Sequence, residues 1–233
     1  MATFQAQVTG LTGITISSSG TIPTEAQLTQ FLIDGVLDVT SKSIKADPRS
    51  AIDFQRESVT TDTQGFDTAG AQVLSVMREA DASGDSDGTT VWEPCRLVPA
   101  VMQSIVVQTD SLSFASIYNP VYIIDDDGLI SVYPIPQSND GYRVLYVNNV
   151  PTDETNDASV TYAHSDLKYF PQDKVPSVAL YAAIRSLETA AASKIAAQDI
   201  ELQQAYLQLA ASFKAEYVVG FQVQQPQGAQ PRR

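Results

Sequence analysis

The last helical segment of the chain, residues 175–219, constrains the fold most strongly. After Pro176 it contains no Pro or Gly, and Ala, Leu, Gln, Glu and Lys, which favour helices, fill it. Two apolar series run through it: Leu180, Ile184, Leu187 and Ala191, then Leu202, Tyr206, Leu209, Phe213 and Tyr217. Steps of three and four residues place each series on one helical face. Between them the stripe weakens, so we expect a helical hairpin with its turn within residues 192–199. A single bent helix is the alternative.

A second amphipathic helix is predicted from Thr24 to about Lys45. Thr24 and Gln27 form a capping-box pattern, and Asp47-Pro48 ends the helix because the residue before a proline disfavours helical geometry. Its apolar stripe consists of Leu28, Phe31, Leu32, Val36 and Val39. This stripe needs a partner, which the C-terminal pair supplies. Residues 23–48 and 165–221 are therefore predicted to form one helical bundle.

The two ends of the chain have a different composition. Residues 1–22 are rich in Thr, Ser and Gly, and we interpret them as an N-terminal arm, which is either a strand that pairs only with a partner or a mobile segment. Residues 222–233 are rich in Gln and Pro. They are predicted to be a flexible C-terminal tail that is ordered, if at all, by a partner.

The middle of the chain, residues 49–164, is predicted to be an inserted β-rich region. Residues 54–61 and 71–79 are expected strands, and residues 97–109 form either a short helix or a strand. The clearest signal is a hairpin of residues 121–124 and 129–133 around an Asp-Asp-Asp-Gly turn. Residues 141–148 alternate as a third strand, expected beside the second in an antiparallel meander. The fold class is therefore predicted as α+β, a helical bundle with an inserted antiparallel β meander.

Charge and cysteine content narrow the possible functions. The net charge is −13 and the sequence pI is about 4.3, whereas binding to phosphate backbones relies on Lys and Arg. We therefore expect no tight binding of nucleic acid. The single cysteine, Cys95, excludes a disulfide within the chain. The N-terminus has neither a basic region nor a long apolar run, so no signal peptide or membrane span is predicted.

Candidate catalytic and metal-binding residues are few. His164, the single histidine, lies in a polar stretch without a nucleophile motif. Cys95 could be a nucleophile with His164, but a lone cysteine is more often an inert packed thiol. Residues 125–127 are three aspartates, which we interpret as a solvated turn. Residues 81–87 resemble a calcium loop, but Ser86 stands where that loop needs Gly. We therefore predict no catalytic, cofactor-binding or metal-binding residue, no cofactor, and no enzymatic activity.

Three segments resemble the head-to-tail connector, or adaptor, proteins of tailed bacteriophages. The first is the early helix TEAQLTQFLIDGVLDVTSKSI, followed by a β insertion. The second is SFASIYNPVYIIDDDGLISVYPIP, which runs into GYRVLYVNN. The third is FPQDKVPSVALYAAIRSLETAAASK with the helix QDIELQQAYLQLAASFKAEY, which resembles the helical pair that closes the family's bundle.

The resemblance implies a virion structural protein that is made in the host cytoplasm. Members of the family form a homo-oligomeric ring, often a dodecamer, docked on the portal in the virion neck. The ring carries the DNA channel from capsid to tail and has no active site. The C-terminal segment commonly reaches the portal, so residues 222–233 are the expected portal contact, and the β insertion is expected to face neighbouring subunits or tail proteins. No membrane partner is implied.

Two other classes remain open from the sequence. Another neck or tail structural protein, such as a tail terminator, would also suit the β-rich middle. A small-ligand protein or an enzyme of unknown type is the other alternative.

Overall fold

The computed structural model describes residues 2–61, 64–80, 91–136, 141–148, 150–154, 158–196 and 198–221. It divides the chain into two compact units. The helical unit consists of Met1–Phe54 with Val150–Arg233, and the β unit is Gln55–Asn149. Helices and mostly antiparallel strands occur together, so the predicted α+β class is confirmed.

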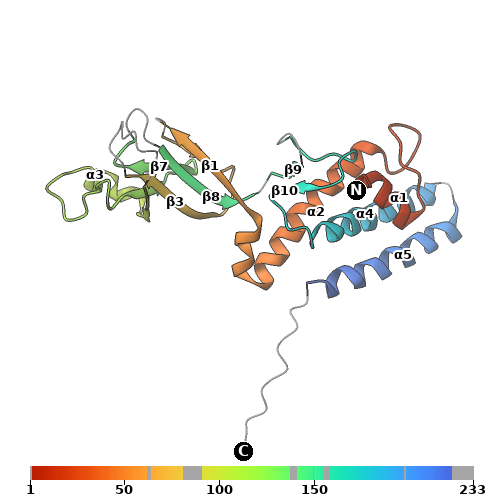
Figure 1. Cartoon of the computed structure of the whole chain (residues 1–233). Helices are drawn as coiled ribbons and strands as arrows, with labels where there is room; N and C mark the ends of the chain where they lie inside the picture. The colour runs from red at the N-terminus through yellow and green to blue at the C-terminus, as the bar shows by residue number, and fades with distance from the viewer. Residues whose placement is uncertain are drawn as a thin grey trace, which may run out of the picture. The chain divides into compact units, whose positions relative to one another are not determined.

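Among the residues that the structure describes, the helical unit contains four α-helices: α1 (Phe4–Thr12), α2 (Glu25–Ala46), α4 (Val175–Ala196) and α5 (Ile200–Val219). The central one is α4, because α1, α2 and α5 all pack against it, as Figure 1 shows. Many of its buried residues are alanines: Ala179, Ala182, Ala183, Ala190 and Ala191. Such small side chains let three neighbouring helices approach one axis closely.

The predicted pairing of the early helix with the C-terminal pair is present in this unit. The α2 helix begins at the expected capping box, in which Thr24 and Gln27 exchange hydrogen bonds between side chain and backbone. Its buried apolar residues include Leu28, Leu32 and Val39. At Gly35 the two helices are so close that a Cβ atom would lie 3.1 Å from Cδ1 of Tyr181 on α4.

The C-terminal segment folds as a hairpin. The α4 helix ends at Ala196 and α5 begins at Ile200, so the turn lies within the predicted range, and a single bent helix is excluded. The Asp199 side chain caps α5 by accepting a hydrogen bond from the Leu202 amide. Only Ala210 and Tyr217 are fully buried on α5, whereas Tyr206, Leu209 and Phe213 are partly buried against α4. This helix therefore lies shallowly on its partner.

The prediction of an N-terminal arm is wrong for residues 4–12, which form α1. The Thr3 side chain caps this helix, and Phe4, Val8 and Thr12 are buried along one face. Those residues recur every fourth position, a helical spacing that the Thr- and Ser-rich composition obscured. Gly13 ends the helix in a left-handed conformation with φ of 69°.

The limits of the inserted region also differ from those predicted. Residues 48–54 form a 3-10 helix, η1 (Pro48–Phe54), which belongs to the helical unit. Phe54 packs edge-on against Phe170, with ring centroids 5.3 Å apart. A two-stranded sheet of β9 (Thr152–Asp153) and β10 (Leu167–Lys168) lies in the same unit, and Val160 is buried in its core. The β unit is thus shorter than residues 49–164.

The described part of the β unit contains two four-stranded sheets. One has the order β1 (Gln55–Thr61), β8 (Gly141–Val147), β3 (Val73–Glu79), β4 (Trp92–Pro94). The other has the order β2 (Phe66–Asp67), β7 (Leu129–Tyr133), β6 (Val121–Ile124), β5 (Arg96–Leu97). Neighbouring strands are antiparallel except for β5 and β6, which are parallel. Residues 100–106 form a 3-10 turn, η2 (Ala100–Met102), and a short helix, α3 (Gln103–Val106), so the helical alternative there is confirmed.

The predicted hairpin is confirmed, but the meander is wrong. Strands β6 and β7 pair around Gly128, whose φ of 81° suits the tight turn. Strand β8, however, lies between β1 and β3 in the other sheet. Pro134 and Pro136 follow β7 and have no N–H to continue its ladder. Instead Tyr142 and Val144 of β8 pack face to face with apolar residues of β7, in one buried cluster.

Candidate functional site

Within the described part of the β unit, several large apolar side chains are exposed on the apolar loop, residues 97–118, which includes α3 (Figure 1). Val101 is 83% exposed, and Leu112 is fully exposed. Leu97, Ile105, Val107 and Tyr118 are further large exposed side chains of this loop. Its single charged residue is Asp110. Exposed apolar patches of this kind mark contacts with other molecules.

The apolar loop is held in place by its own buried side. Val106 and Ala115 are buried in a cluster with residues of β6 and β7. The Ala115 amide donates to the Val106 carbonyl at 2.9 Å, and the Val98 amide donates to the Tyr122 carbonyl at 3.0 Å. Because the backbone is fastened at both ends, the exposed side chains are presented by a folded segment.

The helical unit contains a groove of about 550 Å³ between α1, α4 and α5. Its lining is mostly apolar or small: Ala6, Gly10, Leu11, Pro176, Ala179, Leu180, Tyr217 and Gly220, with Gln7, Ser177 and Glu216 as the polar members. Gly10 borders open space in this lining, since a Cβ atom there would meet nothing within 4 Å. The groove therefore offers an apolar cleft to a side chain from outside.

Tyr217 forms one wall of this groove and is 5% exposed. Its hydroxyl donates a hydrogen bond of 2.6 Å to Oδ2 of Asp38. Burial, followed by this contact with a carboxylate, raises the pKa of Tyr217 well above its usual value. The phenol therefore stays protonated and holds the groove wall in place.

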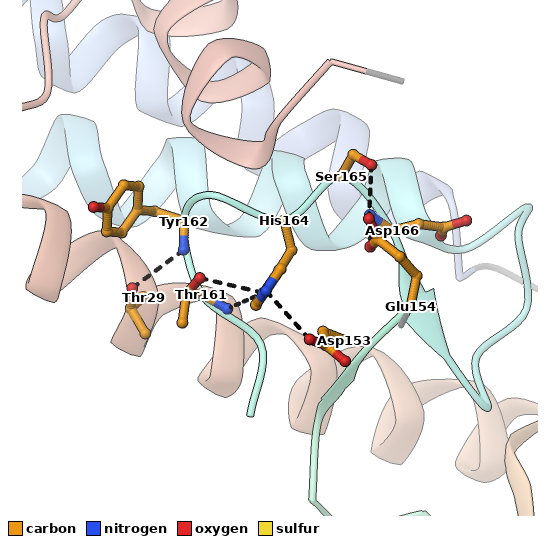
Figure 2. A network of polar contacts seen from close by, with 8 residues as sticks. All are labelled: Thr29, Asp153, Glu154, Thr161, Tyr162, His164, Ser165 and Asp166. Atoms are coloured by element: carbon orange, nitrogen blue, oxygen red, sulfur yellow. Dashed lines mark hydrogen bonds and ion pairs between the residues drawn. The ribbon is translucent and has the colours of Figure 1, made fainter. Parts of the chain in front are cut away.

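His164 is part of a polar network shown in Figure 2. Its Nδ1 accepts a hydrogen bond of 2.9 Å from the Thr161 amide. Its Nε2 lies 3.3 Å from Oδ2 of Asp153, whose side chain is 1% exposed. A ring nitrogen that accepts from an amide carries no proton, so the proton of a neutral ring lies on Nε2, facing Asp153. Both ring nitrogens are thus engaged within the fold.

This network fastens the first turn of α1 and a turn of α2. The Phe4 amide donates to the His164 carbonyl at 2.8 Å, and the Gln5 amide donates to the Tyr162 carbonyl at 3.0 Å. The Tyr162 amide in turn donates to Oγ1 of Thr29 at 3.2 Å (Figure 2). Early amides of a helix lack partners within the helix, so these carbonyls supply them. The geometry gives His164 a positioning role in the fold.

Glu154 closes the other end of the same network. Its two carboxylate oxygens accept hydrogen bonds from the Ser165 hydroxyl at 3.0 Å and the Asp166 amide at 2.7 Å (Figure 2). Burial raises the pKa of Glu154, but these hydrogen bonds outweigh it, and the pKa is lowered. The carboxylate is therefore held ionised as an acceptor for the segment that carries His164.

Cys95 lies in the β unit, whereas His164 lies in the helical unit. The Cys95 amide donates to the Val76 carbonyl at 2.8 Å, and its side chain packs against the apolar cluster of the two sheets. Burial raises the pKa of the Cys95 thiol to about 12, although the nearby Arg78 lowers it in part. At neutral pH the thiol is protonated, which makes it a poor nucleophile.

The acidic candidates divide into two groups. Asp125 accepts a hydrogen bond of 2.8 Å from the Leu129 amide and shapes the hairpin turn, in which residues 126 and 127 are exposed. Residues 81–87 lie outside the described part of the chain. Within the described part, no group of three or more His, Cys, Asp or Glu side chains is arranged to hold a metal ion.

The chain matches no protein-family model, and a search of curated proteins finds no match. Among the described residues, no helix combines the length and apolar character that crossing a membrane requires.

Neither the groove nor the apolar loop was predicted from the sequence. The loop had a signal, because Asp110 is the single charged residue from 97 to 124. The groove had none, since it depends on how α1, an unpredicted helix, lies against α4 and α5.

Proposed function

We propose that this chain is a virion structural protein of a tailed bacteriophage, a head-to-tail adaptor. It forms a homo-oligomeric ring, docks on the portal and continues the DNA channel into the tail. The observation that carries a structural role is the apolar loop. A folded segment that presents Val101 and Leu112 to solvent with one charged residue is suited to burial against another protein.

The choice of an adaptor among virion proteins rests on the three segments that resemble that family. They correspond to α2, to the hairpin β6–β7 with β8, and to the pair α4–α5. The first and third of them share the helical unit, while the second lies in the β unit. A bundle that joins both ends of the chain and carries a β insertion is the arrangement that the resemblance implies.

The acidic net charge of the chain fits a channel through which DNA passes better than it fits a protein that binds DNA tightly. The sequence has 27 acidic residues and 14 Lys and Arg residues. Tight binding to duplex DNA needs many cationic contacts with phosphates. An acidic ring lets DNA slide through without holding it, and the isolated protein is expected to bind duplex DNA weakly at physiological salt.

The proposal assigns no catalytic role to any residue. The two side chains with the best nucleophile or base chemistry, Cys95 and His164, serve packing and positioning in the geometry described above. The partners are other copies of this chain, the portal through residues 222–233, and tail or neck proteins. The location is the virion neck.

The test is to mix the purified chain with the portal ring of the same phage and image the complex by electron microscopy. A variant ending at Phe221 serves for comparison, because the Phe221 ring packs on Tyr217 and this cut leaves α5 intact. The full chain is expected to decorate the portal as a coaxial ring, and the shortened chain is not. Equal melting temperatures of the two proteins are the control.

Binding of the full chain to a tail or neck component and never to the portal contradicts the adaptor assignment. That outcome favours the other structural role, such as a tail terminator. If the full and the shortened chain bind the portal with equal affinity, residues 222–233 are not the portal contact, but the adaptor assignment stands.

A further inference from the structure

We propose that an acidic pocket of the helical unit binds two arginines of the same copy, Arg232 and Arg233. The acidic pocket is formed by residues at the end of α2, in η1, just before α4 and just after α5, and its volume is about 370 Å³. Its lining residues are Ser43, Ala46, Asp47, Ser50, Asp53, Asp173, Lys174, Gly220 and Phe221. The ligand of this pocket is therefore a guanidinium group.

The acidic pocket carries an excess of negative charge, because three aspartates and one lysine line it. The Lys174 ammonium lies 3.6 Å from Oδ2 of Asp173, so these two charges offset each other. Asp47 and Asp53 form no ion pair within the described part of the chain, although Arg49 lies between them in sequence. Two carboxylates are therefore left for a cationic ligand.

A buried hydroxyl in the same lining also lacks a partner. Ser43 is 6% exposed, and its Oγ has no hydrogen-bond partner among the described residues. Proteins leave few buried polar atoms unpaired, so such an atom in the lining of a pocket indicates a polar ligand. A guanidinium has five N–H donors, enough for carboxylates and a hydroxyl together. The Phe221 ring of the lining can in addition pack on the plane of a guanidinium.

The C-terminal segment, residues 222–233, has the matching charge. Arg232 and Arg233 are its charged residues, and the others are Gln, Pro, Gly, Ala and Val. Its two positive charges equal in number the carboxylates of Asp47 and Asp53. A guanidinium donates two parallel hydrogen bonds to a carboxylate, which makes arginine a strong partner for aspartate. Charge complementarity thus favours this segment over an apolar or acidic occupant.

The position of the pocket favours the segment of the same copy. The described residues end at Phe221, which lines the acidic pocket together with Gly220. Arg232 follows Phe221 by eleven residues, a length that spans up to about 36–40 Å when extended. The chain can therefore return to the pocket. Its tether keeps the arginines at a local concentration on the order of millimolar, which a free cation or a second copy does not match in dilute solution.

Binding of the C-terminal segment to the acidic pocket regulates portal docking, a consequence that rests on the proposed adaptor function. Residues 222–233 are the proposed portal contact, so the pocket and the portal compete for the same residues. A free copy keeps its segment in the pocket until the portal displaces it. The binding of the arginines to the pocket does not itself depend on that function.

Fluorescence anisotropy of the full chain measures whether the C-terminal segment is held. In a Cys95→Ala background, Gln230→Cys carries the dye close to the arginines. A held segment reorients together with the helical unit, whereas a released segment reorients on its own within nanoseconds. Release therefore lowers the anisotropy of the dye.

Neutral variants of both sides should release the segment equally. We expect Asp47→Asn with Asp53→Asn to lower the anisotropy, and Arg232→Gln with Arg233→Gln to lower it to the same value. The four substitutions together should lower it no further, because each pair already breaks the same interaction. Asparagine at position 47 keeps a side-chain oxygen that can accept from the Arg49 amide, as Asp47 does at 3.0 Å.

The matched control is Asp126→Asn with Asp127→Asn, which removes two exposed carboxylates from the β unit. It should leave the anisotropy unchanged. High salt should lower the anisotropy of the parent chain towards that of the neutral variants, because it screens exposed charges. Melting temperatures within a few degrees of the Cys95→Ala chain are the control for folding.

Portal affinity gives a second readout. Where about nine in ten segments are held, Asp47→Asn with Asp53→Asn should bind the portal about tenfold more tightly, because the competing pocket is lost. Release by the neutral variants in a chain that never binds the portal supports the pocket and removes the adaptor assignment. Portal docking by a chain whose segment is never held does the reverse.

The proposed contact is overturned if Asp47→Asn with Asp53→Asn keeps the anisotropy of the parent chain. It is also overturned if the control pair at positions 126 and 127 lowers the anisotropy as much. An anisotropy of the parent chain that falls on dilution contradicts it as well, because the segment then occupies the pocket of another copy.

Discussion

Tyr217 on α5 and Asp38 on α2 are joined by a 2.6 Å hydrogen bond, although 179 residues separate them in sequence. Lys42 donates to the same carboxylate oxygen at 2.7 Å, and its ammonium lies 4.6 Å from the centroid of the Tyr217 ring. The ring also packs against Tyr181 and Phe221, with centroids 5.9 Å and 5.1 Å away. Most of α5 is only partly buried against α4, but these contacts of Tyr217 hold the C-terminal end of the helix against α2.

Tyr217→Phe tests this fastening, because it removes the hydroxyl and keeps the ring. We expect a loss of about 1–2 kcal/mol in the free energy of unfolding, the scale of one hydrogen bond to a charged, partly exposed group. Urea denaturation followed by circular dichroism measures it. The control is Tyr118→Phe, at an exposed tyrosine, which should change the free energy by less than about 0.5 kcal/mol. Equal losses in the two variants contradict the prediction.

Ionisation of the Tyr217 hydroxyl should make the free energy of unfolding depend on pH. The pKa of Tyr217 is raised in the folded state above its ordinary value of 10.0, first by burial and then by Asp38. In the unfolded chain the phenol ionises near pH 10, while in the folded chain it stays neutral. The contribution of the neutral Tyr217 phenol to the free energy of unfolding is therefore complete below about pH 10. It is lost as the pH rises from there towards the pKa of the folded state. Above pH 10, wild type should lose stability faster than Tyr217→Phe; a constant difference between them contradicts this.

The elements that could be predicted are those encoded by local patterns. The capping box at Thr24, the apolar spacing of α2 and α4, and the Asp-Gly turn before Leu129 each act within a few residues. The four-residue spacing of Phe4 and Val8 is an equally local helical signal, but the Thr, Ser and Gly residues around it favour an irregular segment.

The elements that could not be predicted depend on contacts between distant residues. Strand β8 pairs with β1, whose partner residues lie at least 80 positions earlier, because its apolar face is buried in one cluster with residues of β7 from the other sheet. Likewise the first amides of α1 find their acceptors at Tyr162 and His164. No local pattern encodes such partners, and the groove beside α1 follows from them.

Phe4→Ala tests the place of α1 in the core. Phe4 is fully buried, so its truncation should cost about 3–5 kcal/mol in the free energy of unfolding. Leu11→Ala, in the same helix at a side chain 41% exposed, is the matched control and should cost clearly less. Urea unfolding curves compare the two. If residues 1–22 were a mobile arm in solution, both variants would unfold like wild type.

Side chains added at Gly35 and at Gly10 are expected to change the free energy of unfolding in opposite directions. At Gly35 a Cβ atom would already lie 3.1 Å from Tyr181, so Gly35→Leu should separate α2 from α4 and cost about 1–3 kcal/mol. At Gly10 nothing lies within 4 Å, so Gly10→Ala should stabilise α1 by about 0.5–1 kcal/mol through the unfolded backbone. A Gly35→Leu melting temperature equal to or above that of wild type would contradict the close approach of α2 and α4, and a fall for Gly10→Ala would contradict the open space at Gly10.

Cys95 provides a chemical measure of burial in the β unit. Burial raises its pKa from 9.0 to about 12, so the thiolate fraction near pH 8 falls by about a thousandfold, and the thiolate is the reactive form. A chromogenic disulfide reagent should therefore label the native chain about a thousandfold more slowly than the chain unfolded in urea. The control is a Cys95→Ala chain with Val101→Cys, whose exposed thiol should react at similar rates in both states. Rapid labelling of native Cys95 would show that the cluster between the two sheets opens to solvent.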